Sequence, residues 1–218
     1  GTLTLAGSVT TTNAQGYSGT SITLGSPAAS FVSLGGGGIA FSGPVNLNGD
    51  VSIQTNGSLT FSSTISNNFT LFLAGSGPTT FGGTVNIFAL DNQRAGVSTI
   101  SSNQTVSTNL SYAGAVTLTG DVVITAGPTT FAGAINSTGG NAFSLTINSE
   151  APVTLADVGT TFALGSFTSD TGPSGTLTVG SIRTRGAIAL RDQQVTLTGS
   201  LSDTTDGGAI AGANFTSN

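Results

Sequence analysis

The chain has 218 residues, of which 65 are Ser or Thr and 33 are Gly, and it contains no Lys, His, Cys, Met or Trp. Only 6% of its residues are charged, against roughly a quarter in an ordinary globular domain, and its formal net charge is −5. Without His and Cys, the chain lacks the usual ligands of zinc or haem, an imidazole base and a thiol nucleophile, so we expect no cofactor. Four Arg against nine acidic residues exclude a basic face for nucleic acid.

Despite its low charge, the sequence is predicted to fold. Hydrophobic residues make up 37% of the chain and β-branched residues are abundant, whereas disordered chains are typically charge-rich and poor in β-branched residues. No apolar run approaches the ~20 residues of a membrane-spanning helix, so we expect no membrane insertion. The chain opens without Met directly into Leu3-Thr4-Leu5, which is typical of a strand. We therefore expect a processed or excised piece of a longer protein.

A repeated motif organises much of the chain. The run Gly77-Pro-Thr-Thr-Phe-Gly-Gly-Thr-Val-Asn86 recurs as Gly127-Pro-Thr-Thr-Phe-Ala-Gly-Ala-Ile-Asn136, and weaker copies start at Phe41, Phe61 and Tyr112. The leading aromatic residues, at positions 41, 61, 81, 112 and 131, are separated by 20, 20, 31 and 19 residues. A near-constant period of this length is typical of repeat proteins in which each repeat stacks on its neighbours.

Within each copy, large residues alternate with small or polar ones. Phe41 and Val45 share one parity and Ser42 and Asn46 share the other, which indicates a strand with one buried face. The small residue between them, Gly43 in the first copy, is expected to let the chain bend toward the core. The predicted core residues are Phe41, Val45, Phe61, Ile65, Phe81, Val85, Tyr112, Val116, Phe131 and Ile135.

This pattern predicts an all-β fold, a right-handed parallel β-helix (β-solenoid) with coils of about 20 residues. We expect one β-solenoid segment over residues 1–218, although the concentration of charge after residue 150 leaves a separate C-terminal domain as an alternative. An antiparallel barrel or sandwich would need hairpins, and only Asn48-Gly49 and Asn56-Gly57 are typical hairpin turns. Two columns of stacked side chains are predicted along the axis: Phe41, Phe61, Phe81 and Phe131 in one, and Val45, Ile65, Val85 and Ile135 in the other.

The 31-residue interval between two copies predicts an insertion. It contains the only charged cluster of the first 120 residues, formed by Asp91, Asn92, Gln93 and Arg94. We expect residues 89–98 to leave the rod as a loop. Such a loop is either a corner of tolerant length or a contact surface for a partner or a neighbouring subunit.

One position of the repeat is rich in Asn. It is occupied by Asn46, Asn86 and Asn136, and by Ser66 and Thr117 in the other copies. Stacked Asn side chains can share amide hydrogen bonds between coils as a ladder. The alternative is an exposed position that accepts any small polar residue.

Parallel β-helices also include enzymes that act on polysaccharides, so the acidic residues are candidates for catalysis. Glycoside hydrolysis needs two carboxylates about 5 to 9.5 Å apart. No pair of acids recurs at the spacing of the repeat. A sugar groove is expected to offer Trp or several Tyr, and this chain has no Trp and two Tyr. We therefore expect no enzyme, and a carbohydrate-active β-helix enzyme is the alternative in a different class.

The repeats resemble the rod of a known family. The Phe-x-Gly-x-Val-Asn-Leu unit at Phe41–Leu47, the run Gly120–Ile124, and the pair Thr178–Ile182 and Gly186–Leu190 are similar to the stalk repeats of filamentous-haemagglutinin-like adhesins. These are large bacterial surface proteins exported by two-partner secretion. The resemblance implies a β-helix rod that is secreted to the bacterial cell surface and adheres there, and it carries over no catalytic residue.

We therefore expect an extracellular structural and adhesive rod, with a glycan or protein on a host or cell surface as receptor. The alternative is a self-assembling subunit of an extracellular filament. A solenoid turn without a cap presents an open sheet edge, and the opening residues Gly1–Leu5 read as a bare strand. Neighbouring repeats of the same chain, or a second copy stacked head to tail, would cover such an edge.

Overall fold

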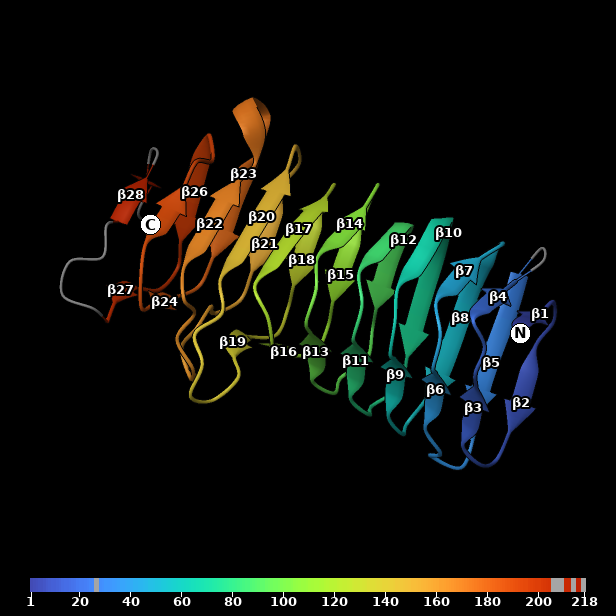
Figure 1. Cartoon of the computed structure of the whole chain (residues 1–218). Coiled ribbons are helices and arrows are strands. Elements are labelled where there is room, and N and C mark those ends of the chain that lie inside the picture. The colour runs from blue at the N-terminus through green and yellow to red at the C-terminus, as the bar shows by residue number, and fades with distance from the viewer. Residues whose placement is uncertain (26–27, 205–209, 213–214, 217–218) are drawn as a thin grey trace.

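The chain folds as a parallel β-solenoid of about ten turns, as the repeat predicts (Figure 1). The computed structural model describes residues 1–25, 28–204, 210–212 and 215–216. Within these ranges there is no α-helix, and one short 3₁₀ helix, η1 (Gly172–Ser174), projects beside the strands of the C-terminal half.

Each turn contributes strands to three faces, in the same order along the chain. The first face consists of β1 (Thr2–Leu5), β4 (Ser21–Leu24), β7 (Val45–Leu47), the first parts of β10 (Ile65–Ala74) and β12 (Val85–Asn92), β14 (Gln104–Val106), β17 (Val122–Ala126), β20 (Leu145–Ser149), β22 (Phe167–Asp170), β25 (Ile188–Leu190) and β28 (Ile210–Gly212).

The second face follows it in every turn. It consists of β2 (Val9–Thr11), β5 (Ala28–Ser33), β8 (Asp50–Thr55), the second parts of β10 and β12, β15 (Leu110–Tyr112), β18 (Thr129–Phe131), β21 (Val153–Leu155), β23 (Thr176–Val179), β26 (Gln194–Leu197) and β29 (Phe215–Thr216).

The third face closes the turn. It consists of β3 (Gln15–Tyr17), β6 (Ile39–Phe41), β9 (Leu59–Phe61), β11 (Thr79–Phe81), β13 (Ser98–Ile100), β16 (Val116–Leu118), β19 (Ile135–Ser137), β24 (Ile182–Thr184) and β27 (Leu201–Asp203). Between β19 and β24, the isolated bridges of Val158 and Leu164 take the place of a strand.

Inward side chains of successive turns stack into columns, because every turn pairs in parallel register with the next. All ten predicted core residues are buried, none more than 1% exposed. The rings of Tyr17, Phe41, Phe61 and Phe81 form one column on the third face, with successive centroids 5.2, 5.2 and 5.7 Å apart. Val45, Ile65 and Val85 form the second predicted column, on the first face.

The prediction that Phe131 and Ile135 continue these columns is wrong. Phe131 lies on the second face, where its ring stacks on Tyr112 at 5.0 Å, and Ile135 lies on the third face beside Val116. The motif spans a corner, and its early copies join the third face to the first. The copies that start at Tyr112 and Phe131 join the second face to the third, so the same residues sit one face earlier.

This shift of the motif also explains the 31-residue interval, and the predicted loop over residues 89–98 is not formed. Strand β12 continues to Asn92, and Ser98 already belongs to β13. Asn92 pairs with Leu73 of the preceding turn and with Tyr112 of the following one. The interval is longer because the motif moves from one corner of the coil to another, while the coils themselves continue without an insertion.

Glycine at the corner is required by the turn below it, and not by a bend toward the core as predicted. A Cβ atom on Gly43 would lie 2.0 Å from the carbonyl oxygen of Gly19, and one on Gly133 would lie 2.5 Å from the amide nitrogen of Ala115. Both distances are far below van der Waals contact. The corners at Gly43 and Gly133 therefore leave no room for a side chain in this direction.

We predict that Gly43→Ala lowers the free energy of unfolding by about 1–3 kcal/mol, because the added methyl forces two turns apart. Urea unfolding followed by circular dichroism measures the change. Gly16→Ala is the matched control, since a Cβ there meets nothing within 4 Å. Equal stabilities of the two variants would contradict the proposed role of the corner.

Candidate functional site

The predicted contact cluster divides between the surface and the core. Gln93 is exposed and donates a hydrogen bond to the half-buried Asp91 carboxylate, whereas Asn92 and Arg94 are 1% and 0% exposed. The prediction that all four residues form an exposed loop is therefore wrong. Charge in a sequence pattern favours a surface position, and a buried Arg departs from that rule.

Arg94 joins three successive turns through main-chain carbonyl groups. Its Nη1 donates hydrogen bonds to Thr55 O at 2.6 Å and Ala74 O at 3.0 Å. Its Nη2 donates to Gly57 O at 2.6 Å and Pro78 O at 3.3 Å. The planar guanidinium presents its donors in a fixed fork, which suits several acceptors at one corner. We call Arg94 and these four carbonyl groups the arginine clamp.

The neighbouring residues make room for the clamp. Gly75 has a φ of +119°, and a Cβ there would lie 2.0 Å from Thr55 O and 3.3 Å from Nη1 of Arg94. The side chain of Asn92 accepts from the Arg94 amide at 3.2 Å and donates to Ser98 Oγ at 2.9 Å. Burial lowers the pKa of the Arg94 guanidinium from its usual value. The arginine clamp therefore stabilises the fold, and its buried guanidinium is not accessible to a partner protein.

Polar residues at other corners also link consecutive turns. The Oδ1 atoms of Asp50, Asn103, Asp121 and Asp157 each accept a hydrogen bond, at 2.7 to 2.8 Å, from a main-chain amide of the next turn. Sequence analysis did not predict this structural role for the three Asp residues or for Asn103. The available sequence signal for this role was an Asp or Asn at the start of a strand, about one turn before the residue whose amide it binds.

Of the three Asn residues at the predicted ladder position, Asn46 alone links neighbouring turns of the first face through its side chain. Asn46 donates to Ser21 Oγ at 2.9 Å and accepts from Ser66 Oγ at 2.8 Å, and Asn86 follows Ser66 in register. Asn136 instead lies on the third face, where its Oδ1 accepts from the amides of residues 161 and 162. It belongs to a different column because its copy of the motif is shifted by one corner.

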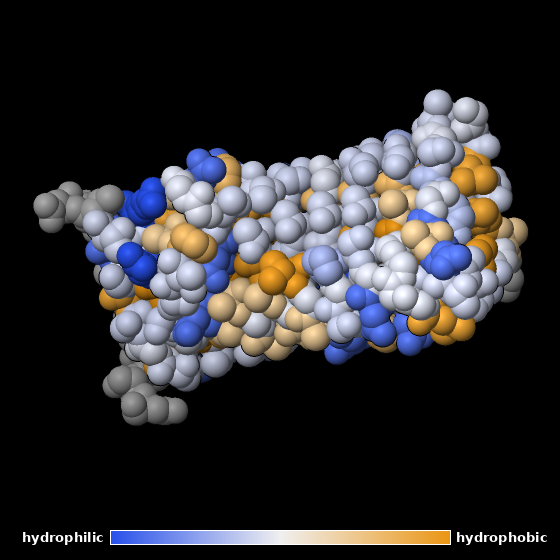
Figure 2. All heavy atoms as spheres, turned by 90° about the horizontal axis from the view of Figure 1, so that it is seen from below, coloured by the Kyte–Doolittle hydropathy of each residue, from blue (hydrophilic) through white to orange (hydrophobic). Residues whose placement is uncertain are grey.

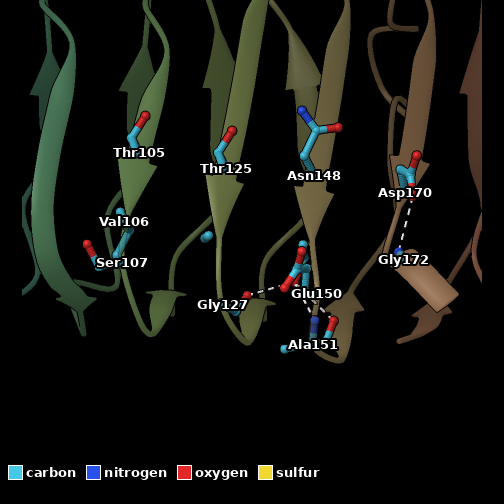
Figure 3. A pocket seen from close by; sticks show the side chains of 12 residues that line it. Thr105, Val106, Ser107, Thr125, Gly127, Asn148, Glu150, Ala151, Asp170 and Gly172 are labelled. Atoms are coloured by element: carbon cyan, nitrogen blue, oxygen red, sulfur yellow. Dashed lines mark hydrogen bonds between the residues drawn. The ribbon is translucent and has the colours of Figure 1, made fainter. Parts of the chain in front are cut away.

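A polar groove of about 570 Å³ runs across four turns where the first face meets the second (Figure 3). Its first row contains Thr105, Thr125, Asn148 and Asp170, which occupy one register position on β14, β17, β20 and β22. The other lining residues are Val106, Ser107, Ala126, Gly127, Ser149, Glu150, Ala151 and Gly172. Sequence reasoning did not find this groove, because its residues come from four separate repeats.

The groove is acidic, with Glu150 and Asp170 in its lining and no basic residue among the lining side chains. The side chains of Thr105, Thr125, Asn148 and Glu150 are exposed. One oxygen of Asp170 accepts a hydrogen bond from the Gly172 amide at 3.1 Å. This bond ties the end of β22 to η1, which lies at the C-terminal end of the groove (Figure 3).

A buried carboxyl group lies one turn beyond the groove. Asp192 is 0% exposed, and its Oδ1 accepts a hydrogen bond from Ser169 Oγ at 2.9 Å. Burial raises the pKa of the Asp192 carboxyl above its usual value, and the hydrogen bond from Ser169 offsets part of this effect. Like Arg94, this group is closed off from any partner.

No protein-family model, curated protein or solved structure matches the chain, so function is argued from its own residues. In the part of the chain that the structure describes, no helix is long and apolar enough to cross a membrane. The described residues also contain no group of three or more acidic, His or Cys side chains arranged to hold a metal ion.

We predict that Arg94→Ala lowers the free energy of unfolding by about 3 kcal/mol, because four carbonyl groups, at least one of them buried, lose their donors. The stability of Arg94→Lys should fall between those of the wild type and Arg94→Ala, because an ammonium group cannot reproduce the fork of guanidinium donors. Denaturant unfolding measures both. The exposed Arg191, replaced by Ala, is the control. A loss no larger than that of this control would show that the clamp adds nothing.

We predict that stability falls as pH rises from about 4 through the raised pKa of Asp192, because the folded state binds this proton more tightly than the unfolded state. Asp192→Asn removes this contribution. It should therefore stabilise the chain more at pH 7 than at pH 3.5, as measured by urea unfolding. Glu150→Gln, at an exposed site, is the control. The prediction fails if the effect of Asp192→Asn is the same at both pH values.

Proposed function

We propose that this chain is a structural and adhesive segment of an extracellular rod on a bacterial surface, as in the filamentous-haemagglutinin-like adhesins that its repeats resemble. One observation carries the proposal: the side chains of the core, the polar side chains at the corners and the buried Arg94 all join one turn to the next. Inward columns, corner carboxylates and the arginine clamp all act between turns. Such a molecule is suited to spacing and display.

The outer faces support the same proposal, because they are mostly uncharged and polar. On the second face, a register column of hydroxyl residues runs through Ser111, Thr130, Thr154, Thr178 and Thr196. A second column on the third face contains Thr60, Thr80, Thr99 and Thr117. Regular hydroxyl arrays give many weak contacts, and a rod that adheres through many copies gains avidity from them.

A filament subunit is the second candidate, because turns that pair in register within the chain can pair in the same way between copies. Among the described residues, β1, β2 and β3 pair only with the second turn. Leu3, Leu5, Val9 and Tyr17 are partly exposed there, and Figure 2 shows hydrophobic atoms at this end of the rod, on its right. A further turn would cover this edge, whether it came from the same polypeptide or from a second copy.

Two measurements test these candidates. Beads coated with the purified chain should bind cultured epithelial cells or bacterial cells above the level of beads coated with a β-solenoid of unrelated sequence. Light scattering over a concentration series, with negative-stain imaging, reports end-to-end assembly. Adhesion without assembly supports the rod segment, and assembly without adhesion supports the filament subunit. Absence of both would refute each candidate.

We also predict no hydrolase or lyase activity on polysaccharides. Asp50, Asp121 and Asp157 are each hydrogen-bonded to a main-chain amide of the next turn, which suits them to a structural role. Reducing-end release from pectin, alginate and β-glucan should therefore stay at the buffer background. Release above that background, abolished by a single carboxylate substitution, would establish the enzyme alternative.

A further inference from the structure

We propose that the polar groove lined by Thr105, Thr125, Asn148 and Asp170 binds a linear glycan that carries no acidic groups, with the glycan lying along the rod axis. This inference rests on the proposed adhesive function and names the surface and the ligand class.

The periodicity of the groove matches a polymer. Four consecutive turns each present a side chain at the same register position, and the turns are separated by roughly 4.8 Å, the distance between paired strands. This spacing is close to the length of one pyranose residue in an extended chain. Figure 3 shows the labelled side chains of this row on neighbouring strands. A linear glycan can therefore place one sugar against each turn.

Polar groups in the groove are free to bind a ligand, unlike those at the corners. Asp50, Asp121 and Asp157 already accept main-chain hydrogen bonds from the next turn. In contrast, Thr125 and Asn148 are exposed, and their hydroxyl and amide groups can both donate and accept hydrogen bonds. Sugar hydroxyl groups need partners of this dual kind.

Apolar side chains add little to the surface of the groove. Val106 and Ala126 belong to its lining, but they are only 1% and 8% exposed because they pack in the core. A ligand would therefore be held by the exposed polar side chains. The groove has no aromatic side chain in its lining, so each contact is weak and the whole length of the groove must be occupied.

The charge of the groove selects among glycans. Glu150 and Asp170 lie in the lining without a basic residue beside them there. Uronic acids, sulfated sugars and sialic acids would place like charges against these carboxylates, which disfavours binding. Neutral sugars avoid this repulsion, and protonated amino sugars gain attraction. The η1 helix at one end of the groove, tied to Asp170 through Gly172, limits how far the glycan extends.

Isothermal titration calorimetry with three hexasaccharides tests the inference. The probes are cellohexaose, the β-1,4-linked hexamer of glucosamine, and hexagalacturonate. The first two should bind, the glucosamine hexamer more tightly and with an affinity that falls as salt rises, because screening weakens its attraction to the carboxylates. Hexagalacturonate should bind at least tenfold more weakly than cellohexaose, or not at all.

Variants locate the site. The double variant Thr125→Ala, Asn148→Ala should weaken cellohexaose binding at least tenfold, and Glu150→Gln should remove most of the preference for the glucosamine hexamer. The matched control is Thr64→Ala, Asn68→Ala, at exposed positions outside the groove and outside both hydroxyl columns. Circular dichroism and melting temperature confirm that each variant is folded.

Each outcome bears on the inference. It is overturned if the wild-type chain binds neither cellohexaose nor the glucosamine hexamer, if hexagalacturonate binds equally well, or if the control variant weakens binding as much as the groove variant. Bead adhesion is measured on the same variants. Adhesion without hexasaccharide binding would reject glycan binding by the groove and leave the proposed adhesive function intact. Hexasaccharide binding without adhesion would support glycan binding by the groove and reject the adhesive function.

Discussion

The structure depends on one constraint: every turn must fit the turn beside it at the spacing of paired β-strands, roughly 4.8 Å. Main-chain pairing fixes that spacing along all three faces, so a side chain has its counterpart directly above and below it. Flat rings meet this requirement by stacking, as Phe41, Phe61 and Phe81 do. Where two corners touch through their main chains, as at Gly43, the same requirement excludes even a methyl group.

Polar side chains also join neighbouring turns, at corners where the main chain is not paired as a strand. At some corners, amide or carbonyl groups bind a side chain of a neighbouring turn in place of its main chain. Asp50 and Asp121 supply acceptors for amides of the next turn, and Arg94 supplies donors for carbonyl groups of the two preceding turns. Several of the few charged residues are thus structural. The groove differs in that several of its polar groups are left for a ligand.

The repeat motif encodes a corner and leaves open which corner it forms. The copies at Phe81 and Phe131 are nearly identical, yet they lie on the third and second faces respectively. Both positions satisfy the same local needs, an inward aromatic residue, a small residue at the bend and an inward aliphatic residue after it. The surrounding coil therefore sets the face. Outer surfaces change along the rod as a result, and the groove arises in the later turns.

The sequence by itself determined the fold class, the approximate coil length and the ten predicted core residues, because a 20-residue period combined with two-residue alternation admits few other folds. Tertiary structure alone decided the face of each strand, the burial of Arg94 and the position of the groove. Local alternation shows which residues point inward and carries no information about which corner follows. A fully buried guanidinium depends on carbonyl groups at residues 55, 57, 74 and 78, and the groove on four turns that meet only when the coil is wound.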